Sequence, residues 1–298
     1  MSDKRVRVEV RDHVATVTLA RPEKHNALDL AMFDAIVAAS EQVATEPGVR
    51  AVVLHGDGPS FCSGIDLASL MSSGDGLDGS LEELAGSVPN RFQRVAYDWV
   101  TLPVPVIAAV HGNCLGGGLQ IALGADIRIA APDARLSVME VRWGLVPDMS
   151  LTQTLPRLVG IDVAKELVYT ARMFSGEEAL RLGVVTRLAE HPLAAAHQLA
   201  RELAGRSPEA IRGAKRLLDQ SWGRPPEVGL GLEAEIQGRL IGSPNQMAAV
   251  IAGMSKQEPQ FTDPAVARAR DGGDRAAGPA GGDRAAEPAG GDRAAEPA

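Results

Sequence analysis

Aromatic residues are scarce in this 298-residue sequence, where Phe, Trp and Tyr together make up 3%. The interior must therefore be packed mainly with Val, Leu, Ile and Ala, and a hydrophobic fraction of 45% is enough for a real core. Only two cysteines are present, Cys62 and Cys114, and neither has a partner at metal-ligand spacing. This scarcity indicates a reducing, cytoplasmic compartment and gives no sign of a metal site.

Basic residues are also fewer than acidic ones. The chain has 30 Lys and Arg against 38 Asp and Glu, and this net charge of −8 argues against binding to nucleic acid. The first ten residues are charged and lack the apolar region of a signal peptide. No stretch reaches the roughly 18 apolar residues that a membrane span needs. We therefore expect a cytoplasmic protein that binds neither nucleic acid nor membrane.

Short apolar strands alternate with helical patterns in the first half of the chain. Val6, Val8 and Val10 alternate with charged residues, as in a strand. Asp29 precedes a helical pattern and is expected to cap that helix. The alternation predicts an α/β domain with a largely parallel sheet. The expected strands are 6–10, 14–18, 51–55, 104–110 and 126–130, and further helices are expected at 92–100 and 121–123.

The C-terminal third is helical in pattern. Asp162, Ser175 and Ser207 are expected to cap helices there. The expected helices are 162–170, 176–182, 192–204, 207–222, 228–241 and 244–256. We divide the chain into a core, residues 1–195, a helical region, residues 196–263, and a tail, residues 264–298.

Two segments differ from the rest in composition. Residues 71–87 are rich in Ser, Gly and Asp, which predicts an irregular excursion. Residues 272–298 are three copies of the nine-residue unit Gly-Gly-Asp-Arg-Ala-Ala-(Gly/Glu)-Pro-Ala. A segment without large apolar side chains cannot bury a core, so we expect the tail to be disordered.

A glycine run, His111 to Gln120, follows one expected strand and opens a helix. Glycine lets the backbone approach a ligand closely, and the free N–H groups at a helix start favour negative charge. The run has neither the spacing of a dinucleotide loop nor the Gly-Lys-Ser/Thr of a P-loop. Tight packing of helix on sheet and stabilisation of an oxyanion both remain open. A second loop, Phe61 to Leu67, follows another strand, so that N–H groups from two loops can converge at one sheet edge.

Two carboxylates, Glu140 and Asp148, stand eight residues apart, with Gly144 and Pro147 between them allowing the chain to fold back. Neighbouring carboxylates can have their pKa values pushed apart, which yields one base and one acid. The alternative is a pair of surface carboxylates in a loop.

These motifs together resemble the crotonase (enoyl-CoA hydratase/isomerase) family over about residues 5–263. The resemblance rests on Arg21-Pro22 with Asn26-Ala27-Leu28, on Phe61-Cys62-Ser63-Gly64-Ile65-Asp66-Leu67, and on His111-Gly112 with Gly116-Gly117-Gly118. It implies a β/α spiral core with a C-terminal helical trimerisation region, assembled as a homotrimer or a dimer of trimers. It also implies an acyl-CoA thioester as substrate, with no cofactor beyond the coenzyme A of that substrate and no metal.

The resemblance further implies an oxyanion hole formed by the backbone N–H groups of Ile65 and Gly117. The turn from Lys24 to Ala27 and the loop from Ser63 to Leu67 are expected to line the coenzyme A groove. The full set of expected substrate-binding residues is Lys24, Ala27, Ser63, Gly64, Ile65, Asp66, Leu67, Gly116, Gly117, Trp143 and Pro147.

The catalytic residues implied by the resemblance are Glu140, Asp148, Ile65, Gly117 and Gln120. Glu140 matches the principal catalytic glutamate of the family, but Gln120 stands where hydratases carry a second glutamate. A glutamine cannot exchange a proton as a carboxylate does, although it can hydrogen-bond a water or the thioester. The spacing of Asp148 from Glu140 resembles dienoyl-CoA isomerases, which carry an aspartate in place of Gln120.

We therefore expect an enzyme that shifts a double bond in an unsaturated acyl-CoA of fatty-acid or related metabolism. The alternatives are an enoyl-CoA hydratase, an acyl-CoA hydrolase and a non-catalytic acyl-CoA binder.

Overall fold

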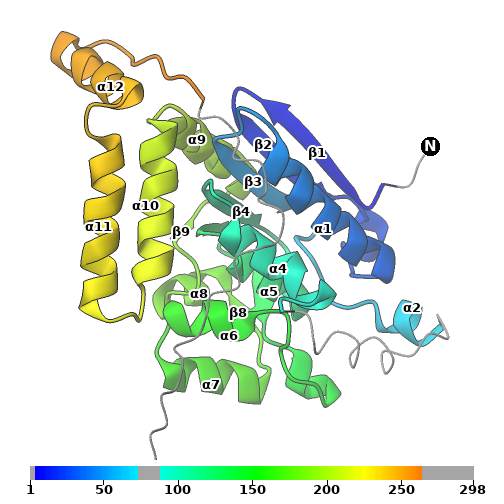
Figure 1. Cartoon of the computed structure of the whole chain (residues 1–298). Helices are drawn as coiled ribbons and strands as arrows, with labels where there is room; N and C mark the ends of the chain where they lie inside the picture. Colours follow the sequence, from blue (N-terminus) through cyan, green and yellow to red (C-terminus); the bar gives the residue numbers. More distant parts are fainter. Residues whose placement is uncertain (1–3, 73–87, 264–298) are drawn as a thin grey trace, which may run out of the picture. The chain divides into compact units, whose positions relative to one another are not determined.

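The core of the fold is a six-stranded sheet with the strand order β1-β2-β3-β4-β6-β9 (Figure 1). It is seen in a computed structural model that describes residues 4–72 and 88–263, all within one compact unit, Met1–Ala265. β1 and β2 form an antiparallel hairpin, and the remaining pairs are parallel. The strands are β1 (Val6–Arg11), β2 (Val14–Leu19), β3 (Ala51–Gly56), β4 (Val106–Val110), β6 (Ile127–Ala130) and β9 (Arg187–Leu188).

A three-stranded sheet lies beside the main one, with the order β5-β7-β8. Its strands are β5 (Asn113–Leu115), β7 (Arg135–Ser137) and β8 (Phe174–Ser175). The α-helices are α1 (Leu30–Thr45), α2 (Leu67–Ser72), α4 (Arg91–Thr101), α5 (Gly117–Leu123), α6 (Leu151–Thr154), α7 (Ile161–Thr170), α8 (Gly176–Leu182), α9 (Pro192–Ala204), α10 (Pro208–Ser221), α11 (Pro226–Leu240) and α12 (Pro244–Ser255). The short 3-10 helices are η1 (Pro22–Lys24), η2 (Glu140–Trp143) and η3 (Leu155–Arg157).

Helices cover both faces of the main sheet (Figure 1). On one face, Ala196 and Ala200 of α9 pack with Val53 and Ile107 of the central strands. On the other face, α1 and α4 share a core with the alternate residues of the same strands. Phe33 of α1 and the ring of Phe92 of α4 meet edge to face, 5.0 Å apart between centroids. Burial on both faces explains the continuous apolar runs of β3 and β4.

The C-terminal helices are tied to the sheet by a buried lysine of α10. Lys215 Nζ donates to Asp126 Oδ2 at 2.7 Å and to the carbonyl oxygens of Val104 at 3.1 Å and Trp99 at 3.3 Å. Arg50, at the start of β3, donates to Asp263 at 2.6 Å and to the Phe261 carbonyl at 3.1 Å. Among the described helices, none is long and apolar enough to cross a membrane.

Most elements expected from the sequence are confirmed. Asp29 caps α1 by accepting the Met32 N–H at 2.8 Å, and Ser175 and Ser207 cap α8 and α10. The expected cap at Asp162 is wrong, because Gly160 precedes the helix and Asp162 lies in its first turn. An acidic side chain there still favours the helix through its dipole.

The expected division at residue 195 falls within α9, which runs from Pro192 to Ala204. Residues 71 and 72 end α2, and the rest of the expected 71–87 excursion lies outside the described residues, as does the 264–298 tail. The small strands β5, β7, β8 and β9 were not expected from the sequence, since each has only two or three residues.

Trp99 offers a direct test of the core. Its side chain is fully buried and its Nε1 donates to the Val95 carbonyl at 2.8 Å. Because Trp99→Ala leaves a large cavity, we expect it to lower the free energy of unfolding by about 3–5 kcal/mol, measured by chemical denaturation. Tyr169→Ala, at a side chain that is 67% exposed, is the control and is expected to change it by less than about 0.5 kcal/mol. Equal effects of the two variants would contradict this packing.

Candidate active site

The loops that follow β3 and β4 run side by side at the carboxyl edge of the sheet. The parallel pairing of the two strands continues into the loops, where Phe61 N–H donates to the His111 carbonyl at 2.9 Å and Cys62 N–H to the Asn113 carbonyl at 3.0 Å. Leu115 N–H returns a bond to the Cys62 carbonyl at 3.0 Å. The two loops expected to form one site are therefore joined by main-chain hydrogen bonds.

Close contact between the loops requires glycine at position 64. Gly64 has φ +88°, and a Cβ there would lie 2.7 Å from the Leu115 carbonyl oxygen and 3.7 Å from the Gly117 nitrogen. Neither the Ile65 N–H, next along, nor the Gly117 N–H at the start of α5 donates to a protein acceptor within the described part of the chain. The arrangement places two unused donors on adjoining loops, as stabilisation of an oxyanion requires.

Glu140 lies against the glycine run. It opens η2, is 6% exposed, and its Oε1 lies 3.2 Å from where a Cβ of Gly116 would be. Burial raises the pKa of Glu140 above its ordinary value, and the negative charge of Asp148 adds to the rise. Oε2 of Glu140 is buried and has no hydrogen-bond partner within the described residues. A carboxylate oxygen without a partner, on a side chain that lies against the glycine run, is suited to act as a base.

Gln120 is buried and its side chain is engaged at both ends. Its Nε2 donates to Glu140 Oε1 at 2.6 Å, and its Oε1 accepts the main-chain N–H of Met149 at 2.9 Å. The Met149 N–H determines which end of the amide faces Glu140, because a flipped amide would set two donors against each other. A glutamine can bond a water or the thioester; among the described residues, the Gln120 side chain bonds Glu140 and Met149.

Asp148 precedes Met149, so the main-chain bond to Gln120 holds it near Glu140. Partial burial raises the pKa of Asp148, although much of the residue is exposed. The structure thus brings Glu140, Gln120, Asp148 and the glycine run together.

The remaining substrate-binding residues divide into two groups. The turn from Lys24 to Ala27 and the loop from Ser63 to Leu67 are brought together: Ser63 N–H donates to the His25 carbonyl at 3.0 Å, and Leu28 N–H to the Gly64 carbonyl at 2.8 Å. Trp143 is 55% exposed and Pro147 half-buried, both on the segment that follows Glu140. The roles of all these residues in binding stay predictions.

The two cysteines are packing residues. Both are fully buried, and burial raises the pKa of Cys62 to about 12. Its Sγ donates to the Asn26 carbonyl at 3.1 Å. A buried thiol with so high a pKa is a poor nucleophile. Among the described residues, no three His, Cys, Asp or Glu side chains form a group that could hold a metal ion.

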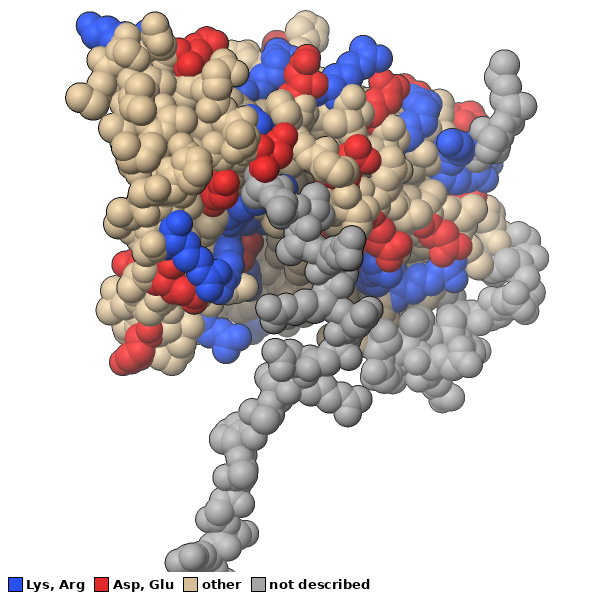
Figure 2. Space-filling model, turned by 45° about the horizontal axis from the view of Figure 1, so that its top comes forward, with Lys and Arg blue, Asp and Glu red and all other residues tan. Residues whose placement is uncertain are grey.

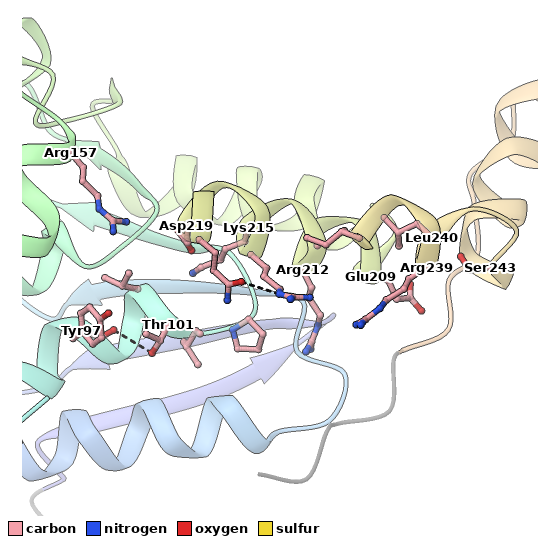
Figure 3. Close-up of a pocket in the computed structure, with 17 residues that line it drawn as sticks. Tyr97, Thr101, Arg157, Glu209, Arg212, Lys215, Asp219, Arg239, Leu240 and Ser243 are labelled. Carbon is pink, nitrogen blue, oxygen red and sulfur yellow. Dashed lines mark hydrogen bonds between the residues drawn. The ribbon is translucent and has the colours of Figure 1, made fainter. Parts of the chain in front are cut away.

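A cavity of about 660 Å³ lies elsewhere, between the end of α4 and the helices α10 and α11 (Figure 3). Tyr97 and Thr101 line one side, and Arg212, Lys215 and Asp219 of α10 the other. None of the candidate catalytic residues lines it. The site with the chemistry described above is therefore separate from this cavity.

The sequence model of the enoyl-CoA hydratase/isomerase family matches residues 9–264. The chain belongs to this family, the crotonases. The predicted crotonase fold is confirmed by the crystal structure of an enoyl-CoA hydratase from Bacillus anthracis, which superposes with a TM-score of 0.78 at 31% identity over 86% of this chain and 98% of that one.

Curated crotonase relatives carry out different reactions. The peroxisomal Delta(3,5)-Delta(2,4)-dienoyl-CoA isomerase of Arabidopsis thaliana is 35% identical over 265 residues, 86% of this chain and 95% of that protein. The mitochondrial methylglutaconyl-CoA hydratase of Mus musculus is 30% identical over 257 residues, 83% of this chain and 79% of that protein. The family is therefore certain, while the choice of reaction depends on the residues of the site.

Gln120→Glu tests the contact between Gln120 and Glu140 in this crotonase. One oxygen of the new carboxylate would still accept the Met149 N–H. The other would replace Gln120 Nε2, which lies 2.6 Å from Glu140 Oε1 in the wild-type structure. Two carboxylates this close resist joint ionisation, so we expect the pair to take up its first proton at a higher pH than Glu140 does alone.

The measurement is a ¹³C NMR titration of the glutamate carboxyl groups, with the Glu140 signal assigned by its loss in Glu140→Gln. Gln153→Glu, at an exposed glutamine of α6, is the matched control and should leave the Glu140 titration unchanged. An unaltered Glu140 titration in Gln120→Glu would show that the two side chains are not in contact.

Proposed function

We propose that this crotonase is an isomerase that shifts a double bond along the acyl chain of an enoyl- or dienoyl-CoA. The observation that carries the proposal is the side chain of Gln120, which is neutral and already bonded to Glu140 and Met149. Because Gln120 supplies no proton, Asp148 is the second acid-base group that the site offers. A pair made of Glu140 and Asp148 suits transfer of a proton between two carbons of one substrate.

In the proposed reaction, the thioester carbonyl oxygen accepts hydrogen bonds from the N–H groups of Ile65 and Gly117. Glu140 lies beside Gly116 and thus near this oxygen, so its free Oε2 removes a proton from the carbon next to the thioester. The electron pair forms an enolate, which the two N–H groups stabilise. Asp148 gives its proton to a carbon farther along the conjugated system, and the double bonds shift with no net gain or loss of atoms.

The directions of the two pKa shifts set the pH dependence expected of this reaction: the shift of Asp148 favours the protonated form that it needs, and the shift of Glu140 opposes the ionised form that it needs. Glu140 must be ionised, so its raised pKa makes turnover fall as the pH drops through that value. Asp148 must hold a proton, and burial raises its pKa in that direction. Turnover then falls again as the pH rises through the pKa of Asp148.

The proposal includes an acyl-CoA as the partner, bound along the Lys24–Ala27 turn and the Ser63–Leu67 loop. It involves no metal and no cofactor beyond the coenzyme A of the substrate. We also propose a cytoplasmic protein that binds neither nucleic acid nor membrane. In support, the chain carries a net charge of −8, and acidic side chains lie among the basic ones on the face in Figure 2.

We further propose a homotrimer or a dimer of trimers. Apolar side chains on the C-terminal helices are unusually exposed, including Leu230 at 63%, Ile251 at 61% and Met254 at 83%. Figure 2 shows a broad area without charged side chains at its upper left, over α12 and the adjoining part of α11. Apolar surface of this kind is typical of subunit contacts.

Light scattering on a size-exclusion column tests the assembly. We expect a mass of about three or six times the 31.2 kDa of the chain. A Leu230→Glu, Ile251→Glu variant should give a smaller species, because it would bury two unpaired charges. Lys165→Glu, at an exposed position on α7, is the control for added charge. A monomeric wild-type protein would contradict the proposal.

Substituting the carboxylates one at a time separates the two proton transfers. In deuterated water, Glu140→Gln should lose both deuterium uptake next to the thioester and the double-bond shift, by about 10²–10⁴-fold. Asp148→Asn should lose the double-bond shift by a similar factor yet keep the uptake, because Glu140 still removes and returns a proton at the same carbon. The readout is mass spectrometry with NMR location of the label. Full turnover in both variants would contradict the mechanism.

The reaction itself is tested with a panel of 2-enoyl-, 3-enoyl- and 3,5-dienoyl-CoA esters. The isomerase proposal expects a product of unchanged mass in ordinary water, a shifted double bond and deuterium uptake in heavy water. Addition of one water would make the protein a hydratase, the reaction that the name of the mouse relative describes. Release of free coenzyme A would indicate hydrolysis, and binding without any change would indicate a non-catalytic binder.

A further inference from the structure

The direction of the Ile65 N–H depends on a loop that belongs to neither a helix nor a strand. The residues on both sides of Ile65 are bonded to Leu28, which follows the Lys24–Ala27 turn. Leu28 N–H donates to the Gly64 carbonyl at 2.8 Å, and Asp66 N–H donates to the Leu28 carbonyl at 3.0 Å. These two bonds leave the Ile65 N–H free. These two bonds can fix the direction of the Ile65 N–H only if Asp66 and Leu28 keep their relative position.

One buried guanidinium joins the turn to this loop. Arg21 is 7% exposed, and its Nη1 donates to the Asp66 carboxylate at 2.9 Å and to the Ala27 carbonyl at 3.0 Å. The same nitrogen lies 3.5 Å from Asp29, which caps α1. A single side chain thus connects the residue after Ile65, the residue before Leu28 and the start of a long helix.

Asp66 completes the connection on the side of the loop. Its Oδ2 accepts from Arg21, while its Oδ1 accepts the N–H of Ser69 in α2 at 3.2 Å. The side chain of Asp66 is 12% exposed, and its charge is compensated by Arg21 together with hydrogen bonding to Ser69.

We infer that Arg21 is the positioning residue that fixes the direction of the Ile65 N–H, acting through Asp66. The inference rests on the proposed function, since it takes the Ile65 N–H as a donor to the thioester oxygen. Arg21 itself touches Asp66, Ala27 and Asp29 and is not a catalytic residue. Lysine is expected to be a partial substitute, because the three contacts all come from one nitrogen, Nη1, and an ammonium can make such contacts but not in the fixed plane of a guanidinium.

The first test is the infrared stretching frequency of a ¹³C-labelled thioester carbonyl bound to the protein. The probe is the tightest binder among short, medium and long saturated acyl-CoA esters, which do not react. Wild-type protein is expected to lower this frequency relative to water, because two N–H groups polarise the carbonyl. Arg21→Gln and Asp66→Asn should each lose most of this lowering, and Arg21→Gln, which lies outside the expected coenzyme A groove, should bind the ester within about threefold of wild type.

Turnover of any substrate found for the wild type gives a second readout. Loss of a well-placed oxyanion donor costs about 10²–10³-fold in kcat, and we expect a loss of this order in Arg21→Gln with little change in KM. Arg21→Lys should recover part of it. If Arg21 acts through Asp66, the double variant Arg21→Gln, Asp66→Asn should lose no more than the worse single variant.

Arg50→Gln is the matched control. Arg50 is 8% exposed and likewise donates to a carboxylate, that of Asp263, and to main-chain carbonyls. It directly precedes β3, whereas loop 60–67 follows the end of that strand. We expect it to lower the melting temperature while leaving the carbonyl frequency and kcat unchanged. Equal losses in Arg50→Gln and Arg21→Gln, or a normal frequency in Arg21→Gln, would overturn the inference.

The two readouts keep the inference separate from the proposed function. A wild-type protein that lowers the carbonyl frequency but shifts no double bond would refute the isomerase and leave the role of Arg21 standing. A wild-type protein that binds no ester, or binds it without lowering the frequency, would refute both.

Discussion

The proposed site depends on two backbone N–H groups, those of Ile65 and Gly117, that have no acceptor within the described part of the chain. Buried N–H groups are usually paired, so leaving two of them free on adjoining loops requires support from the surrounding structure. The parallel pairing of β3 with β4 supplies it by bringing both loops to one sheet edge, where main-chain bonds continue between Cys62 and Leu115. Helix α5 contributes the second donor because its first N–H has no partner within the helix.

The neutral side chain of Gln120 controls what chemistry this frame can support. The Gln120 amide bonds Oε1 of Glu140 and leaves Oε2 of Glu140 without a partner. Its bond to the Met149 N–H holds the preceding residue, Asp148, near Glu140. A carboxylate at position 120 would compete with Glu140 for a proton, whereas an amide cannot. In the proposed isomerase reaction, Gln120 thus acts by holding Glu140 and does not itself exchange a proton.

Local patterns were enough to predict the main strands and helices, the Asp29 cap and the two loops, since each depends on residues close together in sequence. The resemblance of the loop motifs supplied Ile65, Gly117 and Glu140 as candidates. The partners of Gln120 were not predictable, because Met149 lies 29 residues away and bonds through its main chain. The tie from Arg21 to Asp66, 45 residues apart, was missed for the same reason.

A crystal structure with a non-reactive acyl-CoA bound would test the central claim most directly. The account predicts the thioester oxygen at about 2.7–3.1 Å from both the Ile65 and Gly117 nitrogens, with Glu140 Oε2 facing the carbon next to the thioester. A thioester oxygen that accepts from neither nitrogen, or an acyl-CoA seated in the cavity between α4 and α10 instead, would contradict it.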